Sequence, residues 1–143
     1  MEMHGKYLIS GPVSRTLIAS LTEELSKQIH SGGHSIFLGQ VRADVIEGKV
    51  VKAIEYSAYE SMVDAAANSI VDSVLKEFED VNSIQIVHSY GVVKAGEISL
   101  AVLVSAGHRR HAMDACCKTV EMIKERLPVW KREIYEDNSH AWK

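Results

Sequence analysis

The chain has little of several features that mark whole classes of protein. Its 143 residues include two cysteines and two prolines, and its apolar runs fall far short of the roughly 20 helical residues that a bilayer requires. Lys and Arg number 16 against 19 Asp and Glu, which argues against a generally basic nucleic-acid binder. With 46% apolar residues, the composition indicates one compact domain over residues 1–143 that needs neither a membrane nor a nucleic acid.

The cysteines and the N-terminal segment both favour a reducing compartment. Cys116 and Cys117 are adjacent, and neighbouring residues on a helix point about 100° apart, so the pair is unsuited to a disulfide or a chelate. Residues 1–13 lack the apolar region of a secretory signal. We therefore expect a cytoplasmic protein.

Charge is distributed unevenly along the chain. The segment 106–132 carries seven basic and three acidic side chains, a net charge of +4, while the other residues carry nine basic and sixteen acidic side chains. A local basic cluster in an acidic protein predicts a site for an anionic ligand.

Apolar periodicity predicts three helices and six strands. The expected helices begin at Ser14 and continue to Ile29, run from about Glu60 to Phe78, and run from Arg109 to about Leu127, before Pro128. The expected strands are 7–10, 34–42, 49–56, 84–90, 97–105 and 129–135, with 34–42 and 49–56 paired as a hairpin. Hairpins set among helices favour an α+β layer fold over a doubly wound parallel sheet.

The most informative motif is Gly107-His108-Arg109-Arg110-His111, which joins a buried strand to the first turn of a helix. Unpaired backbone N–H groups and the helix dipole attract anions there. Each arginine opposes the dipole by roughly 0.3 to 1 kcal/mol, so keeping both indicates a bound phosphate or carboxylate. A pair of solvated surface charges is the alternative.

A metal site and a cysteine nucleophile are both less favoured. His108 and His111 share one helix face, but no third ligand stands at a recognisable spacing. The two cysteines are better explained as small packing residues, one of them half exposed. We therefore expect no metal ion.

Two lysines near the end of the third helix are candidates for proton transfer. The helix dipole stabilises a lysine near a helix C-terminus, so the position of Lys124 is explained with or without a function. Lys131 follows Pro128-Val129-Trp130, and alternation along a strand aims Lys131 into a cleft and Arg132 away from it. Two nearby lysines lower each other's pKa from about 10.4, which makes an ammonium group usable near neutral pH.

Arg42 ends the predicted strand 34–42 in the N-terminal half, and Phe37 lies within it. If that strand lies beside the third helix, Arg42 supplies another cation and Phe37 an aromatic face for a planar ring. If it does not, Arg42 is a surface charge.

Five segments resemble the large, catalytic subunit of molybdopterin synthase, in that family's order. They are GGHSIFLGQVR, IEYSAYESM, HSYGVVKAGE, SAGHRRHAMDAC and IKERLPVWKRE. The most specific part is His-Arg at a helix start followed by K-x-x-x-P-x-W-K-x-E. Two short segments depart from the usual pattern, Tyr56-Ser57-Ala58-Tyr59 and His88-Ser89, which leaves the side-chain pairing around the pocket open.

The resemblance implies a sulfurtransferase that converts cyclic pyranopterin monophosphate into molybdopterin by adding two sulfur atoms as a dithiolene. It implies a ubiquitin-like small subunit whose C-terminal Gly-Gly carries the sulfur as a thiocarboxylate. Two large subunits and two small subunits would form a heterotetramer around a homodimer. The implied fold is an α/β hammerhead with an added antiparallel β subdomain, and no cofactor is implied.

The resemblance also assigns roles to six residues. Those roles are catalysis for Lys124 and Lys131, and substrate binding for Phe37, Arg42, His108 and Arg109. A helix of about 18 residues is roughly 27 Å long, so its two ends cannot contact one pterin-sized ligand. Either the basic cluster forms two sites, or the active site is completed across the homodimer.

Two other classes of function compete with this interpretation. A non-catalytic protein that binds a phosphorylated metabolite or a ubiquitin-like tail would keep the basic helix start without needing Lys124 and Lys131 close together. A purely structural dimerisation domain would have no concave pocket.

Overall fold

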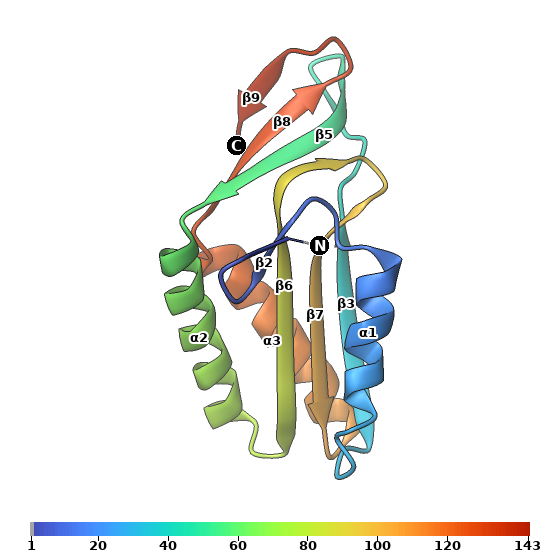
Figure 1. Cartoon of the computed structure of the whole chain (residues 1–143), viewed down its shortest axis with the longest axis vertical. Helices are drawn as coiled ribbons and strands as arrows, with labels where there is room; N and C mark the ends of the chain where they lie inside the picture. Colours follow the sequence, from blue (N-terminus) through green and yellow to red (C-terminus); the bar gives the residue numbers. More distant parts are fainter. Residues whose placement is uncertain (1) are drawn as a thin grey trace.

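The computed structural model describes residues 2–143. Within this range it has three helices and nine strands (Figure 1). The helices are α1 (Arg15–Leu25), α2 (Glu60–Glu77) and α3 (Arg109–Arg126). The strands are β1 (Met3–His4), β2 (Leu8–Ser10), β3 (Gly33–Gln40), β4 (Val45–Ile46), β5 (Lys49–Ala58), β6 (Val81–Lys94), β7 (Ile98–Ala106), β8 (Val129–Tyr135) and β9 (His140–Trp142).

The larger part of the molecule is a sheet covered by helices on both faces. Its strands lie in the order β1, β2, β6, β7, β3, and only the β2–β6 pair is parallel among the described residues. The apolar stripes of α2 and α3 pack with the sheet in one core, while α1 packs on β7 and β2 in a second core. The central strand β7 is buried along almost its whole length, as its continuous apolar sequence predicts.

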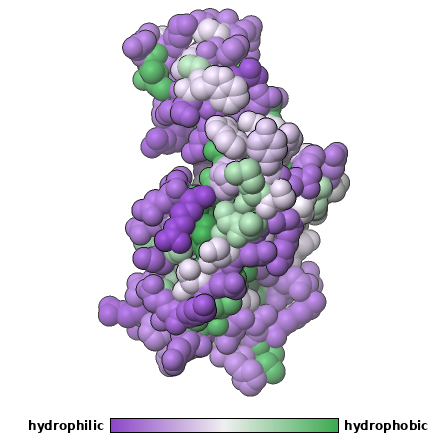
Figure 2. Space-filling model, turned by 90° about the vertical axis from the view of Figure 1, so that its left-hand side faces the viewer, coloured by the Kyte–Doolittle hydropathy of each residue, from purple (hydrophilic) through white to green (hydrophobic). Residues whose placement is uncertain are grey.

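The long strand β6 connects this body to a smaller antiparallel subdomain. Residues 81–88 of β6 pair with β7, whereas residues 91–94 pair with β5. Gly91 lies at the transition with a φ of +92°, a left-handed conformation that favours glycine. The smaller subdomain contains β4, β5, β8 and β9, and Figure 2 shows a hollow where it meets the rest of the molecule.

Most expected elements are present, but the expected hairpin between 34–42 and 49–56 is wrong. β3 pairs with β7 instead, and β5 pairs with β6 and β8. The connecting segment forms its own short β4–β5 ladder, with left-handed φ values at Glu47 and Gly48. Sequence proximity favoured a hairpin, but in the fold β3 lies beside β7, where the partly buried Phe37 packs against the main core.

Two further boundaries differ from expectation. Helix α1 ends at Leu25 rather than near Ile29, which is 81% exposed, and the Ser26 hydroxyl donates a hydrogen bond to the Glu23 carbonyl at the helix end. Strand β6 continues through Gly91 to Lys94. Within residues 2–143, none of the helices is both long and apolar enough to cross a membrane.

Candidate active site

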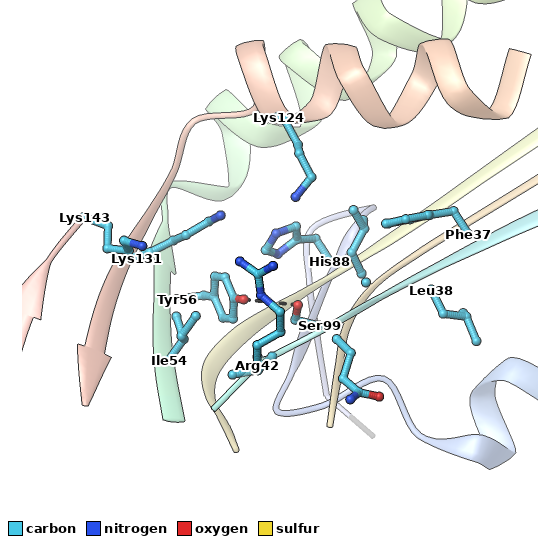
Figure 3. Close-up of a pocket in the computed structure, with 14 residues that line it drawn as sticks. Phe37, Leu38, Arg42, Ile54, Tyr56, His88, Ser99, Lys124, Lys131 and Lys143 are labelled. Atoms are coloured by element: carbon cyan, nitrogen blue, oxygen red, sulfur yellow. Dashed lines mark hydrogen bonds between the residues drawn. The ribbon is translucent and has the colours of Figure 1, made fainter. Parts of the chain in front are cut away.

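A pocket of about 390 Å³ lies where the smaller subdomain meets the main sheet. It is lined by the ends of β3 and α3 and by parts of β5, β6, β7 and β8 (Figure 3). The lining residues are Phe37, Leu38, Gly39, Gln40, Val41, Arg42, Ile54, Tyr56, His88, Ser99, Leu100, Lys124, Lys131 and Lys143. Four of these side chains are basic and none is acidic, so the pocket suits an anionic ligand.

Lys131 and Lys124 reach this pocket from different elements. Lys131 lies on β8 opposite Tyr56 of β5, and Lys124 projects from the last turn of α3 (Figure 3). Burial lowers the pKa of Lys131, and the charges of Lys124 and Lys143 lower it further. A lysine with a lowered pKa is a better proton donor near neutral pH than a solvated one. The register of β8 thus determines which of its two consecutive basic residues faces the pocket.

Arg132, the next residue along β8, does not line the pocket. It forms an ion pair with Glu55 on the neighbouring strand and stacks near the Trp142 ring. Alternation along β8 therefore sends Lys131 and Arg132 in different directions, as the sequence predicts.

Three buried polar side chains form the pocket floor. The Nδ1–H of His88 donates to the Ser89 carbonyl at 2.8 Å, so Nε2 is left as an acceptor. The His88 ring contacts Tyr56 edge to face at 5.1 Å, and the Tyr56 hydroxyl donates to Ser99 Oγ at 3.1 Å. Burial lowers the pKa of His88 to about 4, with Lys131 and Lys124 acting in the same direction, so this imidazole is neutral at pH 7.

None of these floor residues was a candidate from sequence alone. A histidine inside a buried strand was the available signal, since an unpaired buried imidazole is costly. Tyr56 and Ser99 gave no such signal, because both fit ordinary strand positions.

Arg42 and Phe37 also line the pocket. Phe37 packs against the main core, while the Arg42 side chain is 80% exposed and lies 3.3 Å from Asp44. An exposed ion pair of this kind contributes only about 0 to 1 kcal/mol, so an anionic ligand can take over the guanidinium at little cost. Lys143 is held by a backbone bond to Lys131 and an ion pair with buried Glu133 at 3.4 Å.

His108 and Arg109 lie at the opposite end of α3 from Lys124 and outside the pocket lining. Both are exposed. Asp80 contacts this helix end, accepting hydrogen bonds from the His108 backbone N–H and Nδ1, both at 3.1 Å, and from His111 Nδ1 at 2.7 Å. Partial burial would raise the pKa of Asp80, but these hydrogen bonds bring it below its usual value.

The sequence-predicted site residues therefore fall into two groups within one chain. Lys124, Lys131, Arg42 and Phe37 share one pocket, and His108 and Arg109 form an open basic surface at the other end of α3. A single chain therefore has one cationic pocket, and its second basic group faces solvent.

Comparison of the whole chain with known proteins identifies curated relatives. A 39% identical stretch of 115 residues relates the chain to the molybdopterin synthase catalytic subunit of Dictyostelium discoideum, covering 79% of this chain and 72% of the relative. The Taeniopygia guttata protein of the same name is 35% identical over 130 residues, 91% of this chain and 83% of the relative. By contrast, the chain spans only 36% of the length of the Drosophila willistoni relative.

Solved structures and a family model agree with these relatives. The crystal structure of molybdopterin synthase from Staphylococcus aureus matches with a TM-score of 0.81 and 27% identity, covering 99% of this chain and 98% of that one. A complex of subunits 1 and 2 of the molybdopterin-converting factor from Helicobacter pylori, at 18% identity and a TM-score of 0.79, shares the fold over 95% of this chain and 88% of that one. The model of the MoaE protein family matches residues 13–126. The chain belongs to the MoaE protein family.

Proposed function

We propose that the chain is the catalytic subunit of a molybdopterin synthase, a sulfurtransferase of molybdenum cofactor biosynthesis. The curated relatives carry this name. The observation that carries the proposal is the basic pocket in which Lys131, with its lowered pKa, lies near Lys124. A non-catalytic binding protein would have no need for this pairing, and a purely structural domain would have no need for the pocket.

The proposed substrate is cyclic pyranopterin monophosphate, and the proposed sulfur donor is a ubiquitin-like small subunit with a C-terminal Gly-Gly thiocarboxylate. Both the cyclic phosphate and the thiocarboxylate are anions, which suits a pocket with four basic side chains and no acidic one among the described lining residues. A small-subunit partner is also supported by the two-subunit complex from Helicobacter pylori.

The pocket geometry supports distinct roles for its residues. Phe37 offers an aromatic face to the pterin and Arg42 an exchangeable charge for the phosphate. Lys131 and Lys124 act on protons and developing oxyanions as the sulfur attacks the pterin side chain, the cyclic phosphate opens, and the acyl link to the small subunit is hydrolysed. Holding the reactants in one cleft lowers the entropic barrier of each step. This sulfur transfer uses no cofactor and no metal ion.

The proposed active site is completed across a homodimer. Helix α3 has 18 residues, about 27 Å at 1.5 Å per residue, which separates His108 and Arg109 from the lysines of the same chain. If two copies place their α3 helices antiparallel, His108 and Arg109 of the second copy lie beside Lys124 of the first. Twofold symmetry then gives two equal sites.

The surface between the two ends of α3 supports this arrangement. Met113 is 55% exposed, Ile36 42% and Leu38 39%. A groove of about 310 Å³ runs between α3 and β3, lined by Ser35, Ile36, Phe37, Met113, Cys116, Cys117, Val120 and Glu121. Among the described strands β3 pairs with β7 alone, so its other edge is open. Clustered apolar side chains beside an open edge are typical of an interface.

The remaining features of the proposal concern the whole chain and its assembly. Residues 1–143 act as one domain of hammerhead type, with the β4, β5, β8 and β9 group as the antiparallel subdomain. A small subunit binds at each end of the homodimer, which gives a heterotetramer. We place the protein in the cytoplasm, where cysteines such as the exposed Cys117 remain reduced.

Reconstitution tests the proposed function directly. The chain is mixed with a thiocarboxylated small subunit and cyclic pyranopterin monophosphate, and dithiolene formation is measured. We expect product only with the thiocarboxylate, and none when the small subunit ends in an ordinary carboxylate. A chain that binds the small subunit and the pterin but forms no dithiolene would refute the catalytic role.

A further inference from the structure

A cluster of potential metal ligands lies at the start of α3, outside the lysine pocket. Asp80, His108 and His111 each place one ligand atom within 4.8 Å of the others. His108 and His111 have no third ligand at a recognised zinc-motif spacing, but the fold brings Asp80 from the α2–β6 connection, 28 residues before His108. Two imidazoles and one carboxylate form a ligand set that binds Zn²⁺ with a further position left to water.

The backbone around the cluster is held in place. Gly107 N–H donates to the Asp80 carbonyl at 2.9 Å, and the His108 N–H donates to the Asp80 carboxylate at 3.1 Å. A methyl group on Gly32 would lie 2.5 Å from the Gly107 carbonyl oxygen, so the backbone segment at Gly32 also packs closely against Gly107. A ligand set supported on a helix start and a pinned loop loses little freedom when an ion binds.

The side chains already have nearly the spacing that an ion requires. Nδ1 of His108 and Nδ1 of His111 lie 3.1 and 2.7 Å from the two oxygens of Asp80. Ligand atoms about 2.0 to 2.1 Å from a tetrahedral ion lie roughly 3.3 Å apart, so replacing the shared protons by an ion needs only small side-chain movements. The histidine side chains are 81% and 50% exposed, which leaves room for bound water.

The surrounding charges limit the affinity. The helix N-terminus carries a partial positive charge, and Arg109 and Arg110 lie in the same turn without ion pairs among the described residues. Asp80 supplies one full negative charge. The two imidazole nitrogens favour a transition-metal ion such as Zn²⁺ over Ca²⁺ or Mg²⁺, which prefer all-oxygen sites.

We propose that Asp80, His108 and His111 form a binding site for one divalent transition-metal ion of the Zn²⁺ type. The site is separate from the lysine pocket of the same chain. If the proposed function also holds, an ion there engages His108 and therefore competes with anion binding at that helix end.

Calorimetric titration with Zn²⁺ tests this site without any assay of sulfur transfer. The protein is the whole chain with Cys117→Ser, because Cys117 is exposed and a free thiol can bind zinc on its own. We expect one ion per chain, with at least about tenfold weaker binding in Asp80→Asn and in His111→Gln. His30→Gln, which removes an exposed histidine outside the cluster, should bind like the parent.

Two results would overturn the proposal. One is the absence of Zn²⁺ binding by a parent protein whose circular dichroism shows it to be folded. The other is equal affinity in the parent and in both cluster variants, which would place the ion elsewhere. Neither result would affect dithiolene synthesis, so this test and the test of the proposed function fail independently.

Discussion

The two ends of α3 carry similar numbers of basic residues but differ in their surroundings. At its C-terminal end, Lys124 meets Lys131 in a cleft floored by the buried His88. At its N-terminal end, His108 and Arg109 are exposed, with Asp80 as the nearby acid. Lys124 is itself exposed, so the two ends differ in their neighbours, which are the half-buried Lys131 and the buried His88 at one end and Asp80 at the other.

This difference explains why the basic cluster of residues 106–132 does not form one site within a single chain. Burial is the main cause of the lowered pKa of Lys131, and the C-terminal end of α3 has walls on several sides, from β3, β5, β6, β7 and β8. The N-terminal end can bind an anion or a metal ion but cannot bury it. A second copy supplies the missing wall in the proposed dimer.

Among the changes at the two ends of α3, Lys131→Ala should have the largest effect on dithiolene formation. Loss of a proton donor in the pocket is expected to lower kcat for dithiolene formation by about 10²- to 10⁴-fold, with little change in small-subunit binding. Lys124→Ala should show a loss in the same range. The matched control is Lys118→Ala, an exposed lysine on the same helix, and near wild-type turnover by both pocket variants would remove the lysines from the mechanism.

The pH dependence of stability that comes from His88 tests how far water is excluded from the pocket floor. Its pKa is about 4 in the folded protein against 6.5 as the reference value, so protonation favours the unfolded state. This group's contribution to stability is complete above pH 6.5 and is lost as pH falls toward 4, by up to about 3 kcal/mol. Urea unfolding at several pH values should show a shallower pH dependence for His88→Asn than for wild type.

The control for that series is His30→Gln, since His30 is exposed. Other acid-sensitive groups, such as Asp137 with its lowered pKa, remain in every variant and cancel in the comparison. Parallel curves for wild type and His88→Asn would mean that water reaches the pocket floor.

Arg109→Ala should have the smallest effect, and it concerns the open end of α3. Loss of one charge-assisted hydrogen bond of about 1.5 to 3 kcal/mol is expected to weaken pterin binding roughly 10- to 100-fold, with kcat changed much less. Arg110→Ala, the adjacent arginine without an assigned role, is the control. An unchanged dissociation constant for Arg109→Ala would exclude it from the substrate site.

The sequence predicted the elements of this fold better than their pairing. Helical stripes such as Val63, Ala67, Ile70 and Val74 are local patterns, and all four residues are buried as expected. The partner of β3 depends on packing against β7 from the other half of the chain, which local turn signals do not encode. The same limit explains the wrongly expected hairpin.

In the candidate site, too, some residues could be predicted from sequence and others could not. The lysines and arginines stood out because charged residues near buried segments are unusual. His88, Tyr56 and Asp80 did not, because their importance comes from neighbours far away in the sequence, such as Ser99 for Tyr56 and His108 for Asp80. Candidate residues of a reactive type can be predicted from sequence. The residues that tune their pKa or hold them in position can be identified only once the fold is known.

In the proposed dimer, each active site takes residues from both ends of α3, and the two ends come from different copies. The direct measurement uses mixed dimers, isolated with two affinity tags, that contain one Lys131→Ala copy and one His108→Ala/Arg109→Ala copy. If the site spans the dimer, one of its two sites is intact, and with cyclic pterin well below the KM of the His108→Ala/Arg109→Ala protein the mixed dimer retains about half of wild-type dithiolene synthesis. A mixed dimer no more active than the two parent variants would contradict the account.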